Sequence, residues 1–245
     1  MKFDILTLFP EMFKGVFEES IIKRAINNGK VEINLINFIL TNIRDFSKDK
    51  HKKVDDTPYG GGAGMVIKPD VVYSAYKSIA TKNARVIYMS PQGKTLNQSK
   101  VEELSKQEHL IILCGHYEGI DQRVLDTIVD EEISIGDYVL TGGEIPAMVL
   151  IDTVSRYVDG VLSENSKDEE SFSNGLLEYP QYTRPEVFRD KKVPDILISG
   201  HHENISKWRK EQSLKNTFKK RPELLENIEL TEKEKIYIED LKREV

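Results

Sequence analysis

The chain has 245 residues, of which 39% are apolar and 31% are charged, so it can bury a substantial core in one or two domains. Its one cysteine, Cys114, excludes an intrachain disulfide and a cysteine zinc cluster, which is typical of a reducing compartment. The first residues include Asp4 and too short an apolar stretch for a signal peptide, and no later run approaches the ~20 apolar residues of a membrane span. We therefore expect a cytoplasmic protein with no membrane partner.

The net charge of −6 is unevenly distributed. Lys/Arg and Asp/Glu number 19 and 23 in residues 1–159, 1 and 5 in 160–180, 11 and 5 in 181–222, and 4 and 8 in 223–245. The segment 181–222 therefore carries +6, and each of the other three carries −4. This basic block is either an ordinary solvated face or a phosphate-binding surface, because binding to a polyanion depends on the local density of Lys and Arg.

The predicted elements alternate between strands and helices in the first two thirds of the chain. In chain order we expect a strand at 3–9, a helix from Pro10 to Gly29, a strand at 31–38, a helix from Pro69 to 80, a strand at 85–90, a helix near 97–108, a strand at 110–115 and a helix after Gly143. This alternation predicts an α/β fold with a mostly parallel sheet.

A change of composition marks the domain boundary. Residues 159–175 are polar and lack apolar periodicity, so we predict an α/β domain at 1–160, a flexible linker at 161–175 and a helical domain at 176–245. Helical segments are expected from His202 to Pro222, at 222–230 and at 231–245. Trp208 is more typical of a core anchor for this small domain than of a base-stacking platform.

Glycine-containing loops carry the residues that folding explains least. The loops 90–93, 114–121 and 134–146 each follow a predicted strand, and ligands of open α/β sheets bind at the carboxyl ends of strands. The three loops predict one composite pocket, and their few charges suit an adenosine-like ligand held mainly by backbone groups. A fourth loop, 55–66, lacks the Lys-Ser/Thr of a P-loop and is either a flexible loop or a close-approach surface for a flat ligand.

The histidines do not predict a metal site. His109 and His116 have no partner His or Cys at a useful spacing, and the adjacent His201 and His202 point in different directions. We expect structural or RNA-contacting roles for His201 and His202, and we expect none of the four to bind a metal.

With these loops assembled, the sequence closely resembles the bacterial tRNA (guanine-37-N1)-methyltransferases of the SPOUT class. The resemblance covers essentially the whole chain in seven motifs. They are LFPEMF at 8–13, PYGGGAGMV at 58–66, SPQG at 90–93, CGHYEGID at 114–121, IGDYVLTGGEIPAM at 135–148, GLLEYPQYTRP at 175–185 and SGHHENISKWR at 199–209.

The resemblance implies a fold and a function. The fold is an α/β domain whose carboxyl-terminal part forms a trefoil knot, followed by a small all-helical domain, in a homodimer. The function is transfer of a methyl group from S-adenosyl-L-methionine to N1 of guanosine 37 in tRNAs with guanosine at 36, with Mg2+ as a further cofactor for turnover. Two alternatives stay open: a non-catalytic RNA-binding protein on the knot scaffold, and a methyltransferase for another RNA position.

The resemblance also assigns residues. As general base it implies Glu170, where the family usually has Asp, with Asp168 as the other candidate, and Arg156 as the cation near guanine O6. The implied donor-binding residues are Tyr88, Met89, Ser90, Pro91, Gly115, Tyr117, Glu118, Gly119, Ile135, Gly136, Asp137, Tyr138, Val139, Leu140, Gly142, Gly143 and Pro146. The implied tRNA-binding residues are Tyr59, Gly60, Gly61, Ser171, Arg184, His201, His202, Lys207 and Arg209.

Overall fold

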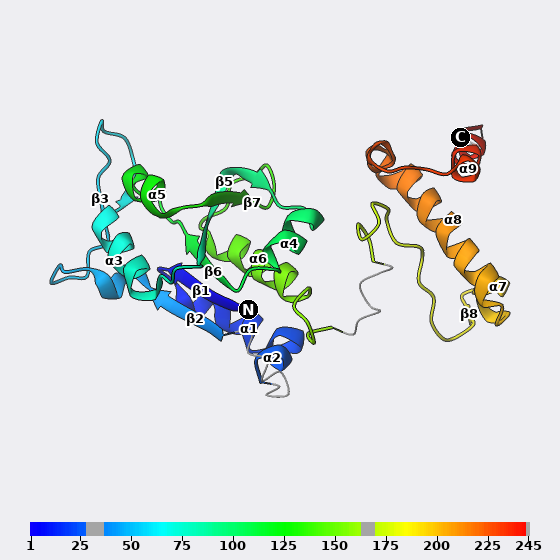
Figure 1. Cartoon of the computed structure of the whole chain (residues 1–245), viewed down its shortest axis with the longest axis horizontal. Helices are drawn as coiled ribbons and strands as arrows, with labels where there is room; N and C mark the ends of the chain where they lie inside the picture. The colour runs from blue at the N-terminus through cyan, green and yellow to red at the C-terminus, as the bar shows by residue number, and fades with distance from the viewer. Residues whose placement is uncertain (28–36, 163–169, 244–245) are drawn as a thin grey trace. The chain divides into compact units, whose positions relative to one another are not determined.

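The computed structural model describes residues 1–27, 37–162 and 170–243 (Figure 1). The chain divides into two compact units, Met1–Leu162 (unit 1) and Ser163–Val245 (unit 2), and each has a hydrophobic core of its own. No helix in the described ranges is long and apolar enough to cross a membrane.

Unit 1 is built on a five-stranded sheet in which every neighbouring pair is parallel. This confirms the mostly parallel α/β sheet predicted from the alternation of elements. In spatial order the strands are β2 (Asn37–Asn42), β1 (Lys2–Thr7), β6 (His109–Cys114), β5 (Arg85–Thr95) and β7 (Glu131–Ser134).

The central strands are apolar throughout because both faces of the sheet are covered. In β6, Leu110 and Ile112 point into one core, whereas Ile111 and Leu113 point into the other. The first core is closed by η1 (Pro10–Phe13), α1 (Lys14–Phe17), α2 (Ser20–Asn27), α4 (Gln98–Leu104) and α6 (Glu144–Ser155). The second is closed by η2 (Ile43–Phe46), α3 (Pro69–Ile79) and α5 (Gln122–Ile128), so helices lie on both faces of the sheet (Figure 1).

Several elements differ from the sequence prediction, among them β5, which was expected at 85–90 and runs to Thr95. The helix expected from Pro10 to Gly29 is divided into η1, α1 and α2, with a left-handed Ser20 (φ 54°) at the second break. This break lets Phe17 and Ile22 enter the same core from two short helices. The first part of the strand expected at 31–38 lies outside the described residues, and α5 was not anticipated.

A two-stranded antiparallel ribbon carries the fourth glycine-containing loop. Its strands are β3 (Asp55–Asp56) and β4 (Val66–Ile67), and the loop 57–65 connects them.

Unit 2 packs three helical segments around a small core. The core residues are Leu176, Leu214, Ile238 and Leu241. The elements are a hairpin of β8 (Val187–Phe188) and β9 (Lys191–Lys192), then α7 (Asp195–Ile198), α8 (His202–Lys220), η4 (Pro222–Asn227) and α9 (Glu232–Arg243).

Two details of unit 2 depart from expectation. The segment expected to be helical at 222–230 is a 3-10 helix that ends at Asn227. Trp208, expected as a core anchor, is half-buried and lies outside the buried cluster, with its ring 6.3 Å from that of Tyr182.

Candidate active site

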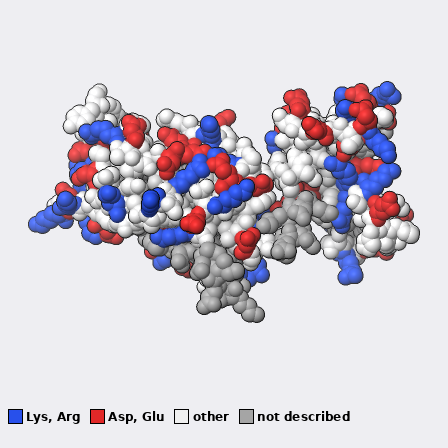
Figure 2. Space-filling model, viewed as in Figure 1, with Lys and Arg blue, Asp and Glu red and all other residues white. Residues whose placement is uncertain are grey.

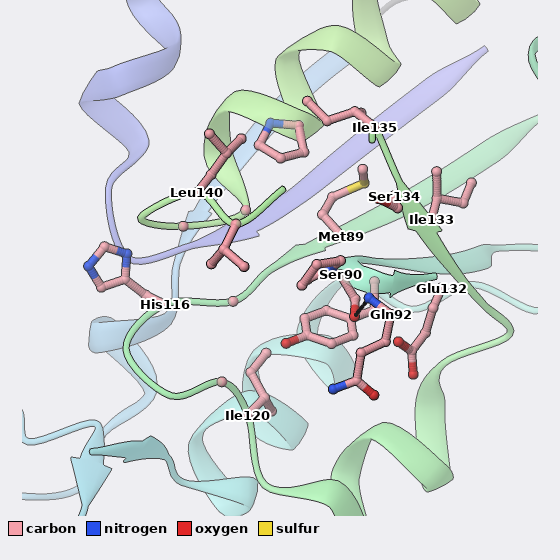
Figure 3. Close-up of a pocket in the computed structure, with 18 of the residues that line it drawn as sticks. Met89, Ser90, Gln92, His116, Ile120, Glu132, Ile133, Ser134, Ile135 and Leu140 are labelled. Atoms are coloured by element: carbon pink, nitrogen blue, oxygen red, sulfur yellow. Dashed lines mark hydrogen bonds between the residues drawn. The ribbon is translucent and has the colours of Figure 1, made fainter. Parts of the chain in front are cut away.

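The carboxyl ends of three strands meet at one edge of the unit 1 sheet. Met89 pairs with Cys114 on β6 and with Ile133 on β7, so β5, β6 and β7 reach this edge at the same level. The loops after β6 and β7, together with residues 90–93 of β5, where the pairing with β7 shifts register between Met89 and Lys94, surround a cavity of about 350 Å³ (Figure 3). The prediction that these three loops form one pocket is therefore confirmed, and the cavity volume lies within the usual range for small-molecule sites.

Almost all of the residues predicted to bind the donor line this cavity. The exception is Asp137, which is exposed and is not part of the lining. The lining includes Tyr88, Met89, Ser90, Pro91, Gly115, Tyr117, Glu118, Gly119, Ile135, Gly136, Tyr138, Val139, Leu140, Gly142, Gly143 and Pro146.

Backbone contacts hold the loop before α6 against the loop after β6. The Gly143 N–H donates to the Gly115 carbonyl at 2.8 Å, and His116 and Gly142 form an antiparallel bridge. A Cβ at Gly143 would lie 2.8 Å from Cys114 Cα and 2.9 Å from Gly115 N. Because both of those atoms belong to the backbone, only glycine fits there.

Tyr88 forms part of the cavity wall. A Cβ at Gly115 would lie 2.7 Å from its hydroxyl oxygen, so glycine at position 115 leaves room for the phenol. Burial, with the carboxylate of Glu132 nearby, raises the pKa of Tyr88 to about 12. The phenol is therefore neutral near pH 7 and can donate a hydrogen bond.

A buried carboxylate fixes the start of α6. Glu144 is almost fully buried and accepts a hydrogen bond from Thr7 Oγ1 at 2.7 Å. An acidic side chain in the first turn also interacts favourably with the helix dipole. Burial and this carboxylate raise the pKa of the Cys114 thiol, so Cys114 is a neutral core residue.

The sequence analysis missed several lining residues. Gln92 and Glu132 lie close together on one side of the cavity, across from His116 and Leu140 (Figure 3). Ser134 is buried and braces the next loop, because its hydroxyl accepts from Gly136 N and donates to Gly136 O. The missed residues lie within or beside the predicted loops, so their proximity to the strand ends was the available signal.

The base of the fourth glycine-containing loop is attached beside the cavity. Glu118 N donates to Met65 O, and Ile67 N donates to Gly119 O, each at 3.0 Å. The tip of the loop extends into solvent: Tyr59 is 99% exposed. The predicted tRNA-binding residues Tyr59, Gly60 and Gly61 are therefore accessible to a macromolecule next to the cavity.

Of the predicted catalytic residues, Arg156 belongs to unit 1, and it is not part of the cavity lining. Glu144 begins α6 at the cavity, and Arg156 follows the helix 12 residues later, which corresponds to about 18 Å along the axis. Glu170 belongs to unit 2, where its carbonyl oxygen accepts from Ser173 N and Oγ. Asp168 lies outside the described residues.

The remaining predicted tRNA-binding residues are in unit 2. Ser171 is half-buried, and its hydroxyl accepts from Glu178 N at 3.0 Å. Arg209 stacks on the Tyr179 ring, with 4.7 Å between its guanidinium carbon and the ring centroid. The other four are exposed: Arg184, His201, His202 and Lys207.

His109 and His116 pack against other side chains of unit 1. His109 is buried, and its ring nitrogens contact Asp4 Oδ2 at 2.7 Å and Thr81 Oγ1 at 2.8 Å. The His116 ring packs against those of Phe9 and Tyr117. Across the described ranges, no group of three or more His, Cys, Asp and Glu side chains is arranged to hold a metal ion.

A parallel α/β sheet with a small-molecule cavity at the carboxyl ends of its strands defines a ligand-binding α/β protein. Comparison with known proteins identifies the family. The profile described as tRNA (Guanine-1)-methyltransferase TrmD matches residues 1–227, and the chain belongs to this family.

Curated relatives cover nearly the whole chain, and three of them illustrate the similarity. Each is named tRNA (guanine-N(1)-)-methyltransferase. The protein from Ruminiclostridium cellulolyticum is 62% identical over 93% of this chain and 97% of its own. That from Halalkalibacterium halodurans is 55% identical over 100% and 99%. That from Dictyoglomus turgidum is 54% identical over 100% and 98%.

Proposed function

We propose that this protein transfers a methyl group from S-adenosyl-L-methionine to N1 of guanosine 37 in tRNAs that have guanosine at 36. It acts in the cytoplasm as a homodimer. The observation that carries the proposal is the cavity at the sheet edge, lined by three glycine-containing loops in a chain that belongs to the tRNA (guanine-1)-methyltransferase family.

The cavity residues fit the donor. Glycine at 115 and 143 lets the loops that line the cavity pack closely against Tyr88 and against the end of β6, and the neutral Tyr88 supplies a hydrogen-bond donor. Pro91 and Leu140 supply apolar contacts from two of the loops. When bound, S-adenosylmethionine supplies an electrophilic methyl group.

The chain's own residues supply proton transfer and charge stabilisation. Guanine N1 carries a proton that must leave as the new bond forms, and the Glu170 carboxylate accepts it. Negative charge develops on the ring toward O6, where the guanidinium of Arg156 stabilises it. Glu170 has one methylene more than the Asp usual in the family, which extends its reach.

Homodimerisation is supported by exposed apolar side chains on three neighbouring elements. Met12 and Val16, four residues apart on η1 and α1, are 44% and 36% exposed, and Ile145 and Val149 on α6 are 46% and 38% exposed. Since Arg156 lies at the far end of α6 from the cavity of its own chain, a second copy can bring an Arg156 to this cavity.

The trefoil knot belongs to the same proposal. Between β7, at the sheet edge, and α6, the chain crosses the end of β5 to bond with Gly115 and His116 after β6. This crossing agrees with a threaded chain, although threading runs against the general rule for chain connections. The Mg2+ implied by the resemblance stays a prediction, and chelation by EDTA during turnover tests it.

Mass spectrometry of tRNA nucleosides tests the proposed reaction. Incubation with the donor should yield 1-methylguanosine in a transcript with guanosines at 36 and 37, and much less in one with adenosine at 36. If the protein binds the donor and the transcript but forms no 1-methylguanosine, it is a non-catalytic RNA-binding protein. Product at another nucleotide would indicate a different RNA position.

Single substitutions test the general base. Glu170→Gln should keep donor binding and lower kcat by about a hundredfold or more, because general-base catalysis contributes that much. Asp168→Asn tests the other candidate, and Glu178→Gln is a matched acid-to-amide control that should leave kcat unchanged. Full turnover by the Glu170→Gln protein would exclude Glu170 as the base.

A further inference from the structure

The β8–β9 hairpin is an ordered projection of unit 2. Val187 pairs with Lys192 and Phe188 with Lys191, and Val193 N donates to Glu186 O at 2.9 Å. The two residues between the strands, Arg189 and Asp190, both have left-handed φ angles, 47° and 63°. Two consecutive left-handed residues form the tight two-residue turn of a hairpin, so the tip has a defined shape.

The hairpin exposes apolar side chains that folding does not require. Every residue from 181 to 192 is exposed, and Phe188 and Val187 have exposed fractions of 62% and 54%. Neither belongs to the buried cluster of unit 2 or to the residues packed against it. The Arg189 guanidinium lies 5.4 Å from the Phe188 ring centroid, so an aromatic face and a cation stand together at the tip.

The charges around Phe188 favour a polyanion. Residues 184–192 contain four Lys/Arg and two Asp/Glu, so the segment carries a net charge of +2. Within the described ranges Lys192 forms ion pairs with Glu186 and Asp195, whereas no ion pair involves Arg184, Arg189 or Lys191. Basic side chains continue along α8, and on the face shown in Figure 2 Lys and Arg gather there.

We propose that the hairpin tip is a base-stacking site for the RNA substrate, with the Phe188 ring against one unpaired nucleobase and Arg189 and Lys191 at the flanking phosphates. This inference rests on the proposed function for its partner. An exposed aromatic ring beside basic side chains is the combination that recognises single-stranded nucleic acid, because every base offers a stacking face and every nucleotide a negative charge. A partner protein would not require this excess of positive charge.

The test uses the full-length protein and an unmodified tRNA transcript with guanosines at 36 and 37. Phe188→Ala should weaken transcript binding at least about fivefold and raise KM for tRNA, because stacking on one aromatic ring accounts for that much affinity. Phe188→Trp should restore binding. Donor affinity, kcat and thermal stability should stay as in the parent protein, since Phe188 is exposed and unit 1 holds the cavity.

Tyr73→Ala is the matched control. Tyr73 is 40% exposed on α3 of unit 1, and the Lys77 ammonium lies 5.8 Å from its ring centroid. Like Phe188, Tyr73 is therefore an exposed aromatic ring beside a cation, but it belongs to the other unit. The control should bind the transcript normally. Equal binding by the parent and Phe188→Ala proteins, or equal weakening by Tyr73→Ala, would overturn the proposal.

Two further readouts separate stacking from other contacts. A fully paired RNA duplex should bind the parent and Phe188→Ala proteins equally, and a weaker binding of the variant there would overturn stacking in favour of a phosphate contact. A change in molar mass of Phe188→Ala by light scattering would overturn it in favour of a hairpin that joins two copies of the chain. If the parent protein neither binds nor methylates the transcript, the proposed function fails first, and the hairpin site fails with it.

Discussion

Tyr88 gives the cavity a pH dependence that can be measured. Its pKa is raised from 10.0 to about 12, so between these values the unfolded chain loses a proton that the folded chain keeps. The free energy of unfolding therefore falls as the pH rises above 10. At pH 11 this residue accounts for a loss of about 1.4 kcal/mol relative to pH 8. Urea unfolding at both pH values should show that the free energy of unfolding falls less in the Tyr88→Phe protein than in the parent protein. Equal falls in the two proteins would contradict a raised pKa for Tyr88.

Gly143 tests the close approach of two backbones. A Cβ there would lie under 3 Å from Cys114 Cα and Gly115 N, and neither atom can move without displacing β6 or its loop. Gly143→Ala should weaken donor binding at least about tenfold and lower the free energy of unfolding by about 1–3 kcal/mol, as overpacking does. Isothermal titration and urea unfolding measure the two effects.

Gly15→Ala is the matched control for that substitution. Gly15 lies within α1, and a Cβ there would meet no atom within 4 Å. Alanine should stabilise the helix by up to about 1 kcal/mol and leave donor binding unchanged. A similar loss in both variants would show that the contact at Gly143 is not the cause.

At the same scale, the sequence predicts the glycine-rich cavity lining better than its polar side chains. Gly115 and Gly143 stand out because strand ends are followed by glycine, and the resemblance covers both. Glu132 and Gln92 belong to ordinary strand sequence, and only the pairing of β5 with β7, with its register shift between Met89 and Lys94, brings them to the cavity. Asp137 is the opposite case. It belongs to a motif that the resemblance assigns to the donor site, but it is not part of the cavity lining.

At the scale of elements, the turn that holds Glu170 depends on one buried threonine. Thr217 is fully buried in α8, where its hydroxyl accepts from Leu177 N at 2.9 Å and donates to Ser213 O at 2.7 Å. Thr217→Val keeps the shape but leaves the Leu177 N–H unpaired, which should lower the free energy of unfolding by about 1–3 kcal/mol. Hydrogen exchange should accelerate at residues 172–178 before the rest of unit 2.

Thr153→Val controls for the removal of a threonine hydroxyl. The Thr153 hydroxyl donates only to Val149 O and Leu150 O, carbonyl groups of its own helix α6. Removing it leaves no N–H unpaired, so stability should change by less than about 0.5 kcal/mol. If thermal unfolding shows equal losses in the two variants, the Leu177–Thr217 bond does not hold the turn.

The elements differ in how well local sequence specifies them. α3 begins at Pro69, as predicted, because proline at the first position and apolar spacing agree. The β8–β9 hairpin was missed because its strands have two residues each, and Arg-Asp is not a usual turn pair. The break at Ser20 was missed because helical apolar spacing continues on both sides of it, and the shared core decides the angle between α1 and α2.

At the scale of the whole molecule, the regions proposed to bind tRNA and the methyl donor differ in charge. The net charge of −6 opposes binding to RNA, but residues 181–222 carry +6, and all of them belong to unit 2. The cavity that we propose for the donor lies in unit 1 and is lined mainly by neutral groups. Salt should therefore affect the two binding equilibria differently, and whole-chain charge would not predict this.

Titrations at several salt concentrations measure that difference. Between about 50 and 200 mM salt, transcript affinity should fall by at least about tenfold, as expected when about three or more phosphates are neutralised and release counterions, whereas donor affinity should change by less than about twofold. Replacing Lys219 and Lys220, exposed in the last turn of α8, by glutamine should reduce the slope of log K against log salt by about 0.7 for each phosphate that is no longer neutralised. Lys242→Gln in α9, outside the basic block, should leave that slope unchanged. Equal slopes in the parent protein and both variants would place the RNA-binding surface elsewhere on the molecule, because the slope counts the phosphates that the basic block neutralises.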